Sequence, residues 1–148
     1  VAITPACAFV DPWAAVVIGF VAGILCSLAV GLKYIFNIDD SLAGVGVHLV
    51  GGIWGSLSVG IFGSAAVNSI GLDGVLYGGG TALLMKQLLG VGLVFAYSFI
   101  ATLIIGFAIE KTMGFRIKRE NELEGIDLVE HAESAYEFAG TTPGGSSL

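Results

Sequence analysis

His48 is the residue of this chain whose type and setting could support chemistry. It is the only titratable side chain between Asp40 and Asp73, and it lies in an apolar stretch. Imidazole changes charge near neutral pH and, when neutral, has both a donor and an acceptor nitrogen. It can therefore relay a proton or accept one from a small polar solute. A neutral histidine that bonds a neighbouring helix is the alternative explanation of this position.

The sequence offers His48 no partners for metal or covalent chemistry. Zinc requires three or four ligands, and the second histidine, His131, lies far away in the tail. Cys7 and Cys26 lack metal-ligand spacing, and we expect both to be small buried hydrophobic residues. The serines near His48 have no carboxylate in the same stretch to orient a base. We therefore predict no enzyme activity, no metal and no cofactor.

The composition indicates a membrane protein. The chain has 148 residues, of which 55% are hydrophobic and 12% charged, and its mean hydropathy is +0.91. Soluble domains have about a quarter charged residues. The net charge of −6 leaves no basic surface for phosphate backbones, so we exclude nucleic acid as a partner.

Three uncharged stretches predict helices that span the lipid bilayer. They are Trp13–Leu32, residues 41–62 and Gln87–Ile109, and each has the roughly 20 residues that a bilayer requires. Helices are expected because each span must satisfy its own backbone hydrogen bonds. Turn residues interrupt Gly63–Gly80, which we expect to be a loop. The predicted fold class is an all-α membrane protein.

Three regions follow from this pattern. Residues 1–12 resemble the end of a preceding transmembrane helix and an outer loop, which suggests a fragment of a longer protein. Residues 13–114 form the three-helix transmembrane region. Residues 115–148 form an acidic tail, for which a solvated extension is the simplest interpretation.

Basic residues predict the orientation in the membrane. Lys33 lies in the first connection, and Lys86 alone lies on the opposite side. The other four follow the third span: Lys111, Arg116, Lys118 and Arg119. Basic residues favour the cytoplasmic side. We therefore expect a multi-pass protein of the cytoplasmic membrane whose carboxy terminus lies in the cytoplasm.

Small residues at four-residue spacing predict close contacts between helices. They are Gly19, Gly23, Ser27 and Gly31 in the first span, and Gly52, Ser56 and Gly60 in the second. Such stripes let helix backbones approach each other in lipid. Trp54 lies on a different helix face from His48, and we interpret it as a packing residue.

Several motifs in order resemble one family of membrane proteins. They are Ile3 to Cys7, Asp39 to Ser41, Gly46 to His48, Gly51 to Gly55 and Gly125 to Asp127, followed by His131, Glu133 and Tyr136. Together they resemble the ammonium transporters of the Amt/Mep/Rh group, on the bacterial Amt side. The resemblance implies a homotrimer whose subunits each have eleven helices, with two inverted five-helix repeats around one pore. This chain would supply the carboxy-terminal portion.

The resemblance also implies roles for residues along the substrate pathway. His48 matches the second of two pore-lining histidines that ammonia passes after ammonium loses a proton; methylammonium would pass as methylamine in the same way. Thr4 falls near the pore, although a helix-end hydroxyl bonded to its own backbone is an equally good explanation. Asp39 and Asp40 match an acidic pair at the cytoplasmic mouth, where helix capping is the alternative to a role in substrate exit.

Two features of the resemblance concern the cytoplasmic side. Many family members have an Asp and a bulky residue where this chain has Ala43 to Val45, which leaves the geometry of the pore exit open. The tail residues that match the family signature are Gly125, Asp127, His131, Glu133 and Tyr136. In the family this tail helps to dock PII regulatory proteins, but a turn and a helix cap would explain the same residues.

The leading hypothesis is the carboxy-terminal part of an ammonium channel or transporter that moves ammonium or ammonia through an apolar pore. The alternative is a truncated, non-conducting membrane module that associates with full-length subunits or regulatory proteins. An ammonium sensor is a third possibility, although sensors of this family usually carry an additional signalling domain.

Overall fold

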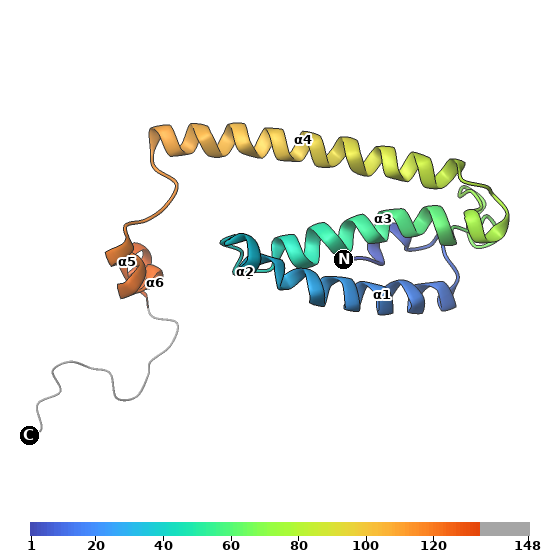
Figure 1. The fold of residues 1–148 in the computed structure, drawn as a ribbon, viewed down its shortest axis with the longest axis horizontal. Coiled ribbons are helices and arrows are strands. Elements are labelled where there is room, and N and C mark those ends of the chain that lie inside the picture. Colours follow the sequence, from blue (N-terminus) through green and yellow to red (C-terminus); the bar gives the residue numbers. More distant parts are fainter. Residues whose placement is uncertain (134–148) are drawn as a thin grey trace, which may run out of the picture. The chain divides into compact units, whose positions relative to one another are not determined.

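The computed structural model describes residues 1–133, and all regular structure in that part of the chain is helical. Three segments are long and apolar enough to cross a membrane: Pro12–Phe36, Gly44–Phe62 and Ala82–Thr112. The helices are α1 (Pro12–Val30), α2 (Leu32–Phe36), α3 (Val50–Phe62), α4 (Ala82–Thr112), α5 (Arg119–Glu124) and α6 (Ile126–His131) (Figure 1). Short turns of other helix types are η1 (Thr4–Ala6), η2 (Gly44–Leu49) and η3 (Val75–Tyr77). The predicted all-α membrane fold with three spans is confirmed.

The helix boundaries differ from the prediction at two places. The second span begins at Gly44 rather than at residue 41, because Ala43 has a left-handed backbone (φ 54°) that a helix cannot include. The third span begins at Ala82 rather than at Gln87, since Lys86 does not interrupt the helix. Between them, residues 63–81 form turns and the short η3, as expected for a loop.

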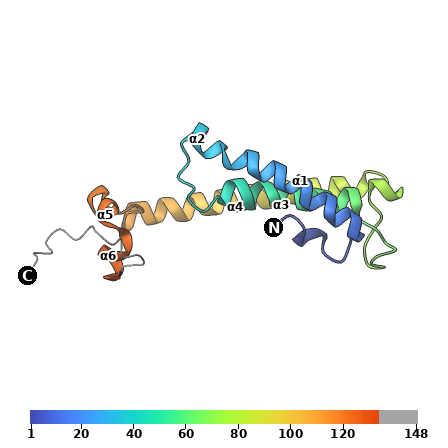
Figure 2. The same ribbon diagram turned by 90° about the horizontal axis from the view of Figure 1, so that it is seen from below.

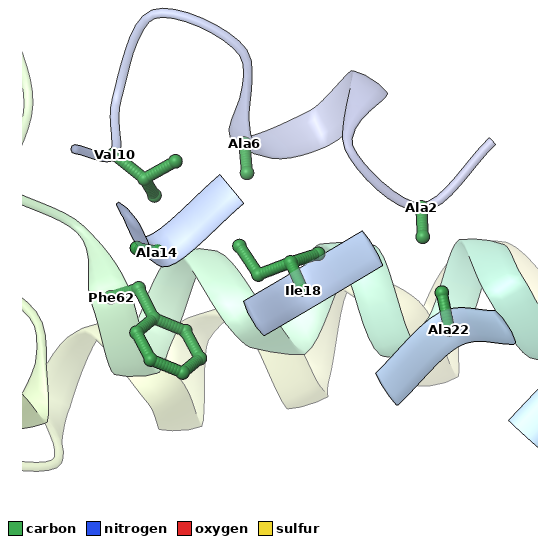
Figure 3. Close-up of a cluster of buried hydrophobic side chains, with 7 residues drawn as sticks. All are labelled: Ala2, Ala6, Val10, Ala14, Ile18, Ala22 and Phe62. Atoms are coloured by element: carbon green, nitrogen blue, oxygen red, sulfur yellow. The ribbon is translucent and has the colours of Figure 1, made fainter. Parts of the chain in front are cut away.

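The core of the first compact unit, Val1–Phe99, is built mainly from small side chains. Its buried residues are Ala2, Ala6, Val10, Ala14, Ile18, Ala22 and Phe62 (Figure 3). Ala14, Ile18 and Ala22 recur every four residues and so form one face of α1. The amino-terminal segment packs against α3 (Figure 2). Small side chains allow the amino-terminal segment, α1 and α3 to approach one another closely, as helices in lipid do.

Glycines make the closest contacts in this core. A Cβ atom on Gly55 would lie 2.1 Å from the carbonyl oxygen of Ala2, and one on Gly60 would lie 2.5 Å from Cα of Leu84. By contrast, a Cβ on Gly19, Gly23 or Gly52 would meet no atom of residues 1–133 within 4 Å. Of these stripe residues, Gly60 makes a close contact within the described chain, and close contacts of Gly19, Gly23 and Gly52 with further helices stay a prediction. The contact face of α3 contains Gly51 and Gly55, one position away from Gly52 and Ser56.

The loop after α3 is fastened to the segment that precedes α1. The Ser64 N–H donates to the Phe9 carbonyl (2.9 Å), and the Ala65 N–H donates to Asp73 Oδ1 (2.8 Å). The Tyr77 hydroxyl donates to the Asp11 carboxylate. That hydrogen bond favours the neutral phenol and is the main reason why the pKa of Tyr77 is raised above its ordinary value. These contacts close one end of the α1–α3 pair.

Candidate functional site

His48 lies on an unusual turn at the start of the second span. Gly44–Leu49 is a π-helical turn, and His48 is exposed on it. Its imidazole forms no hydrogen bond with any described residue. π-helical turns inside α-helices occur frequently at functional sites. The sequence contained no signal for this turn, because its residues suit an ordinary apolar helix equally well.

Asp40 holds the beginning of this turn. Its Oδ1 accepts a hydrogen bond from the Gly44 N–H (2.6 Å), and its Oδ2 accepts one from the Val45 N–H (2.9 Å). The bond from Val45 is the largest cause that holds the pKa of Asp40 below its ordinary value. The bond from Gly44 and the positive charge of Lys33 act in the same direction. This geometry is that of a helix cap, and Asp40 thereby supports the turn that carries His48.

The same turn is pressed against the end of α1. A Cβ on Gly46 would lie 2.8 Å from the backbone nitrogen of Val30, so only glycine fits there. The Cys26 thiol donates a long hydrogen bond to the Val47 carbonyl (3.8 Å). Cys26 is half-buried by this contact, whereas Cys7 is exposed. The expectation that both cysteines are buried is therefore wrong for Cys7 in the described chain.

Trp54, six residues after His48, connects α3 to α1. Its indole N–H donates to the Ile18 carbonyl (3.0 Å), and its ring packs against the buried core. This hydrogen bond satisfies the polar end of an otherwise apolar side chain. The packing role predicted for Trp54 is confirmed.

Thr4 is the other residue predicted for the substrate pathway, and Asp39 belongs to the acidic pair predicted as a helix cap or as the cytoplasmic mouth. Thr4 begins η1 and is exposed, and its hydroxyl makes no hydrogen bond within residues 1–133. The segment that contains it contacts α3 through its neighbours, since Ala2 lies against Gly55. Asp39 is also exposed and precedes the capping residue Asp40. Thr4 thus belongs to the amino-terminal segment, which packs against α3, and Asp39 belongs to the connection that leads into η2.

The described tail residues of the family signature lie at or near α6, in the second compact unit, which begins at Ile100. Gly125 joins α5 to α6 with φ 108°, a conformation that favours glycine. Asp127 lies in the first turn of α6 and His131 is its last residue. The Glu133 N–H donates to the Asp127 carbonyl (3.2 Å). Tyr136 lies outside the described residues.

Comparisons with known proteins match almost the whole chain. The model of the family described as "Ammonium Transporter Family" matches residues 1–136. An ammonium transporter of Mycobacterium tuberculosis (strain ATCC 25618 / H37Rv) is 49% identical over 144 residues, which are 94% of this chain and 30% of the relative. Ammonium transporter Amt1 of Archaeoglobus fulgidus is 44% identical over 135 residues, 91% of this chain and 34% of the relative.

An ammonium transporter of Bacillus subtilis (strain 168) is 39% identical over 138 residues, which are 93% of this chain and 34% of that protein. The chain thus spans about a third of the length of these curated relatives. The extent of the family match, together with the apolar spans, settles its classification. The chain belongs to the ammonium transporter family.

Proposed function

We propose that this chain forms one part of an ammonium channel or transporter of the cytoplasmic membrane, with His48 lining an apolar pore. The observation that carries the proposal is the exposed imidazole of His48 within a span of a chain that belongs to this family. In this proposal the chain supplies the carboxy-terminal part of the family fold. The carboxy terminus then lies in the cytoplasm, as the distribution of basic residues favours.

Desolvation explains why an apolar pore would select the neutral amine. Burying an ion in apolar surroundings costs far more than burying a neutral polar molecule that keeps a hydrogen bond. Ammonium therefore gives up a proton to the water outside the pore before it crosses, and the neutral ammonia accepts a hydrogen bond from the ring of His48 or donates one to it. The imidazole suits this task because its two nitrogens offer both kinds of hydrogen bond. Thr4 lies near this path, and Asp39 and Asp40 lie at its cytoplasmic mouth.

A pore of this kind needs walls beyond the described helices. Across its whole length, α4 has no residue that the rest of the described chain buries. Further helices of the inverted-repeat fold would cover such surfaces and face His48 across the pore. The complete protein is then an eleven-helix subunit of a homotrimer.

A chimaera tests the role of His48. This chain would replace the matching third of the Bacillus subtilis ammonium transporter, and methylammonium uptake would be measured in cells that lack their own transporters. We expect His48→Leu to reduce uptake about tenfold, the value of one lost hydrogen bond of about 1.4 kcal/mol. Leu49→Ala, next to it on the same turn, serves as the control and should keep uptake near that of the parent chimaera. Unchanged uptake with His48→Leu would refute the proposed role.

The second candidate is a non-conducting module that associates with full-length subunits, and the uncovered surface of α4 favours it. Co-purification of the 148-residue chain with a full-length subunit would test this idea. Loss of the association with Gly52→Leu, on an open face of α3, would support helix contacts as its basis. Either candidate predicts that the chain in liposomes carries no methylammonium by itself.

The tail is proposed to regulate transport. Gly125, Asp127, His131, Glu133 and Tyr136 would form part of a docking surface for PII regulatory proteins. The turn at Gly125 and the short helix after it support this proposal, because they give the segment a defined shape. Binding of a purified PII protein to the chimaera, and its loss with Gly125→Val, would test it.

A further inference from the structure

The connection between α4 and α5 concentrates most of the positive charge of the chain. Residues 111–119 contain four of the six basic residues and no acidic one, while Glu110 and Glu120 flank them. Two large apolar side chains lie between Lys111 and Arg116: Met113 is 86% exposed and Phe115 is 68% exposed. Exposed apolar side chains beside basic ones are typical of segments that lie at the surface of a membrane.

The length of α4 places this connection at the lipid headgroups. Its 31 residues extend about 46 Å at 1.5 Å per residue, whereas the hydrocarbon core is about 30 Å thick. The uncharged part of α4 runs only from Gln87 to Ile109, so Glu110 and the residues after it lie beyond the hydrocarbon. Lys111 and the residues after it then lie at the depth of the phosphate groups.

The connection has a defined shape. The Gly114 N–H donates to the Ile109 carbonyl (3.1 Å), and the Phe115 N–H donates to Glu110 Oε2 (2.8 Å). Gly114 has a φ of 79°, which allows the chain to turn directly after the helix. These contacts fix Phe115 next to the end of α4. The backbone that precedes Arg116 is therefore fixed by hydrogen bonds to α4.

A cavity of about 430 Å³ adjoins this turn. Residues 113–118 line it together with Glu120, Asn121 and Glu130. The guanidinium of Arg116 and the ammonium of Lys118 supply its positive charge, and two carboxylates supply its negative charge. Arg116 is held by Glu122 through hydrogen bonds of 2.9 and 3.2 Å. The side chain of Arg116 is 66% exposed, and both hydrogen bonds come from its Nη2 nitrogen, so an external anion that binds this nitrogen competes with the Glu122 carboxylate.

We propose that residues 111–119 bind the headgroups of anionic phospholipids, and that Glu122 competes with the lipid phosphate for Arg116. The phosphate competes with the Glu122 carboxylate at the Nη2 nitrogen of Arg116, because a guanidinium binds the anionic oxygens of a phosphate or of a carboxylate with charge-assisted hydrogen bonds. Lys118 adds a second positive charge, and the side chains of Met113 and Phe115 rest among the upper acyl carbons. The exposed apolar residues favour a lipid over a soluble phosphate. This binding does not require conduction of ammonium.

The test uses the full 148-residue chain in micelles of an uncharged detergent. Native mass spectrometry would compare its affinity for phosphatidylglycerol with that for phosphatidylcholine of the same acyl chains. We expect a preference for phosphatidylglycerol that falls about fivefold with each of Arg116→Gln and Lys118→Gln. Circular dichroism would verify that the variants keep their helical content.

The competing carboxylate gives the sharper comparison. Glu122→Gln should raise the affinity for phosphatidylglycerol about two- to fivefold, because an exposed ion pair of this size no longer opposes the lipid. Glu124→Gln removes the same charge from the same helix and should have little effect. Equal effects of the two variants, or equal affinity for the two lipids, would overturn the proposal. Displacement of phosphatidylglycerol by millimolar inorganic phosphate would overturn the choice of a lipid as the ligand.

Discussion

At the scale of single residues, the candidate site depends on an anionic cap as much as on the histidine. Asp40 receives the N–H groups of Gly44 and Val45, which would otherwise lack partners at the start of a helix in apolar surroundings. Lys33 adds a hydrogen bond from its ammonium to the Asp40 carbonyl (3.2 Å). These hydrogen bonds fix the backbone at Gly44, which lies four residues before the exposed His48. The orientation of the imidazole therefore depends on a carboxylate that does not touch it.

Asp40→Asn is expected to lower the melting temperature of the chain in detergent. The folded pKa of Asp40 is depressed below its ordinary value of 3.8, so the carboxylate stabilises the fold at every pH above that value. This stabilisation is lost as the pH falls through the folded pKa. Thermal melts followed by circular dichroism should show a constant difference between the two chains from pH 7 to pH 5. The difference should shrink below pH 4, because the asparagine does not titrate.

At the scale of helices, α1 and α3 are held together by close backbone approach rather than by large side chains. Ile18 is the only large apolar side chain of the described residues that is completely buried, and alanines and glycines make up most of the remaining contact. The buried Ser58 donates to the Gly55 carbonyl of its own helix (2.7 Å), so it adds no unpaired polar group. The pair is therefore sensitive to single added methyl groups on one face of α3 and tolerant of them on another.

Gly55→Ala and Gly52→Ala form a matched pair that tests this asymmetry. A methyl group on Gly55 would collide with the backbone of Ala2, and we expect it to destabilise the fold by about 2–3 kcal/mol. The same group on Gly52 meets open space, and the better helix propensity of alanine should stabilise α3 by up to about 1 kcal/mol. Chemical unfolding of the purified chain in detergent measures both changes. Equal effects would show that the α3 contact with Ala2 is absent.

At the scale of the whole molecule, charge and hydropathy determine how the chain lies in the bilayer. Three apolar segments alternate with polar connections, and five of the six basic residues lie within the last residues of the first segment or at and after the end of the third. The loop of residues 63–81 contains no basic residue. Basic residues are retained on the cytoplasmic side during insertion. The loop that Asp11 and Tyr77 help to close is thus expected on the outer side.

Cysteine labelling tests this orientation. Cys7 and Cys26 would first be replaced by alanine, and single cysteines would be introduced as Ser69→Cys in the loop or Ser41→Cys in the first connection. Both serines are exposed. A membrane-impermeant maleimide added to intact cells should label the cysteine at position 69 and leave the one at position 41 unlabelled. The opposite pattern would invert the orientation and move the tail out of the cytoplasm.

The existence of the spans and the position of His48 within one of them followed from the sequence alone. Uncharged runs of about 20 residues require a bilayer, and lipid requires helices, so neither conclusion depends on which segments touch. The family motifs likewise are local. The cap predicted at the acidic pair needed only the short distance from Asp40 to the helix that follows.

Only the tertiary structure decided which small residues make contact and how His48 is presented. Gly51 and Gly55 face a neighbour while Gly52 does not, because the position of the amino-terminal segment, not the spacing of glycines, selects the face. The π-helical turn likewise depends on the fit of Gly46 against Val30 and on the bonds to Asp40. Contacts between residues distant in sequence determine both the contact face of α3 and the π-helical turn. The spacing of small residues along one helix does not say which segment packs against that helix.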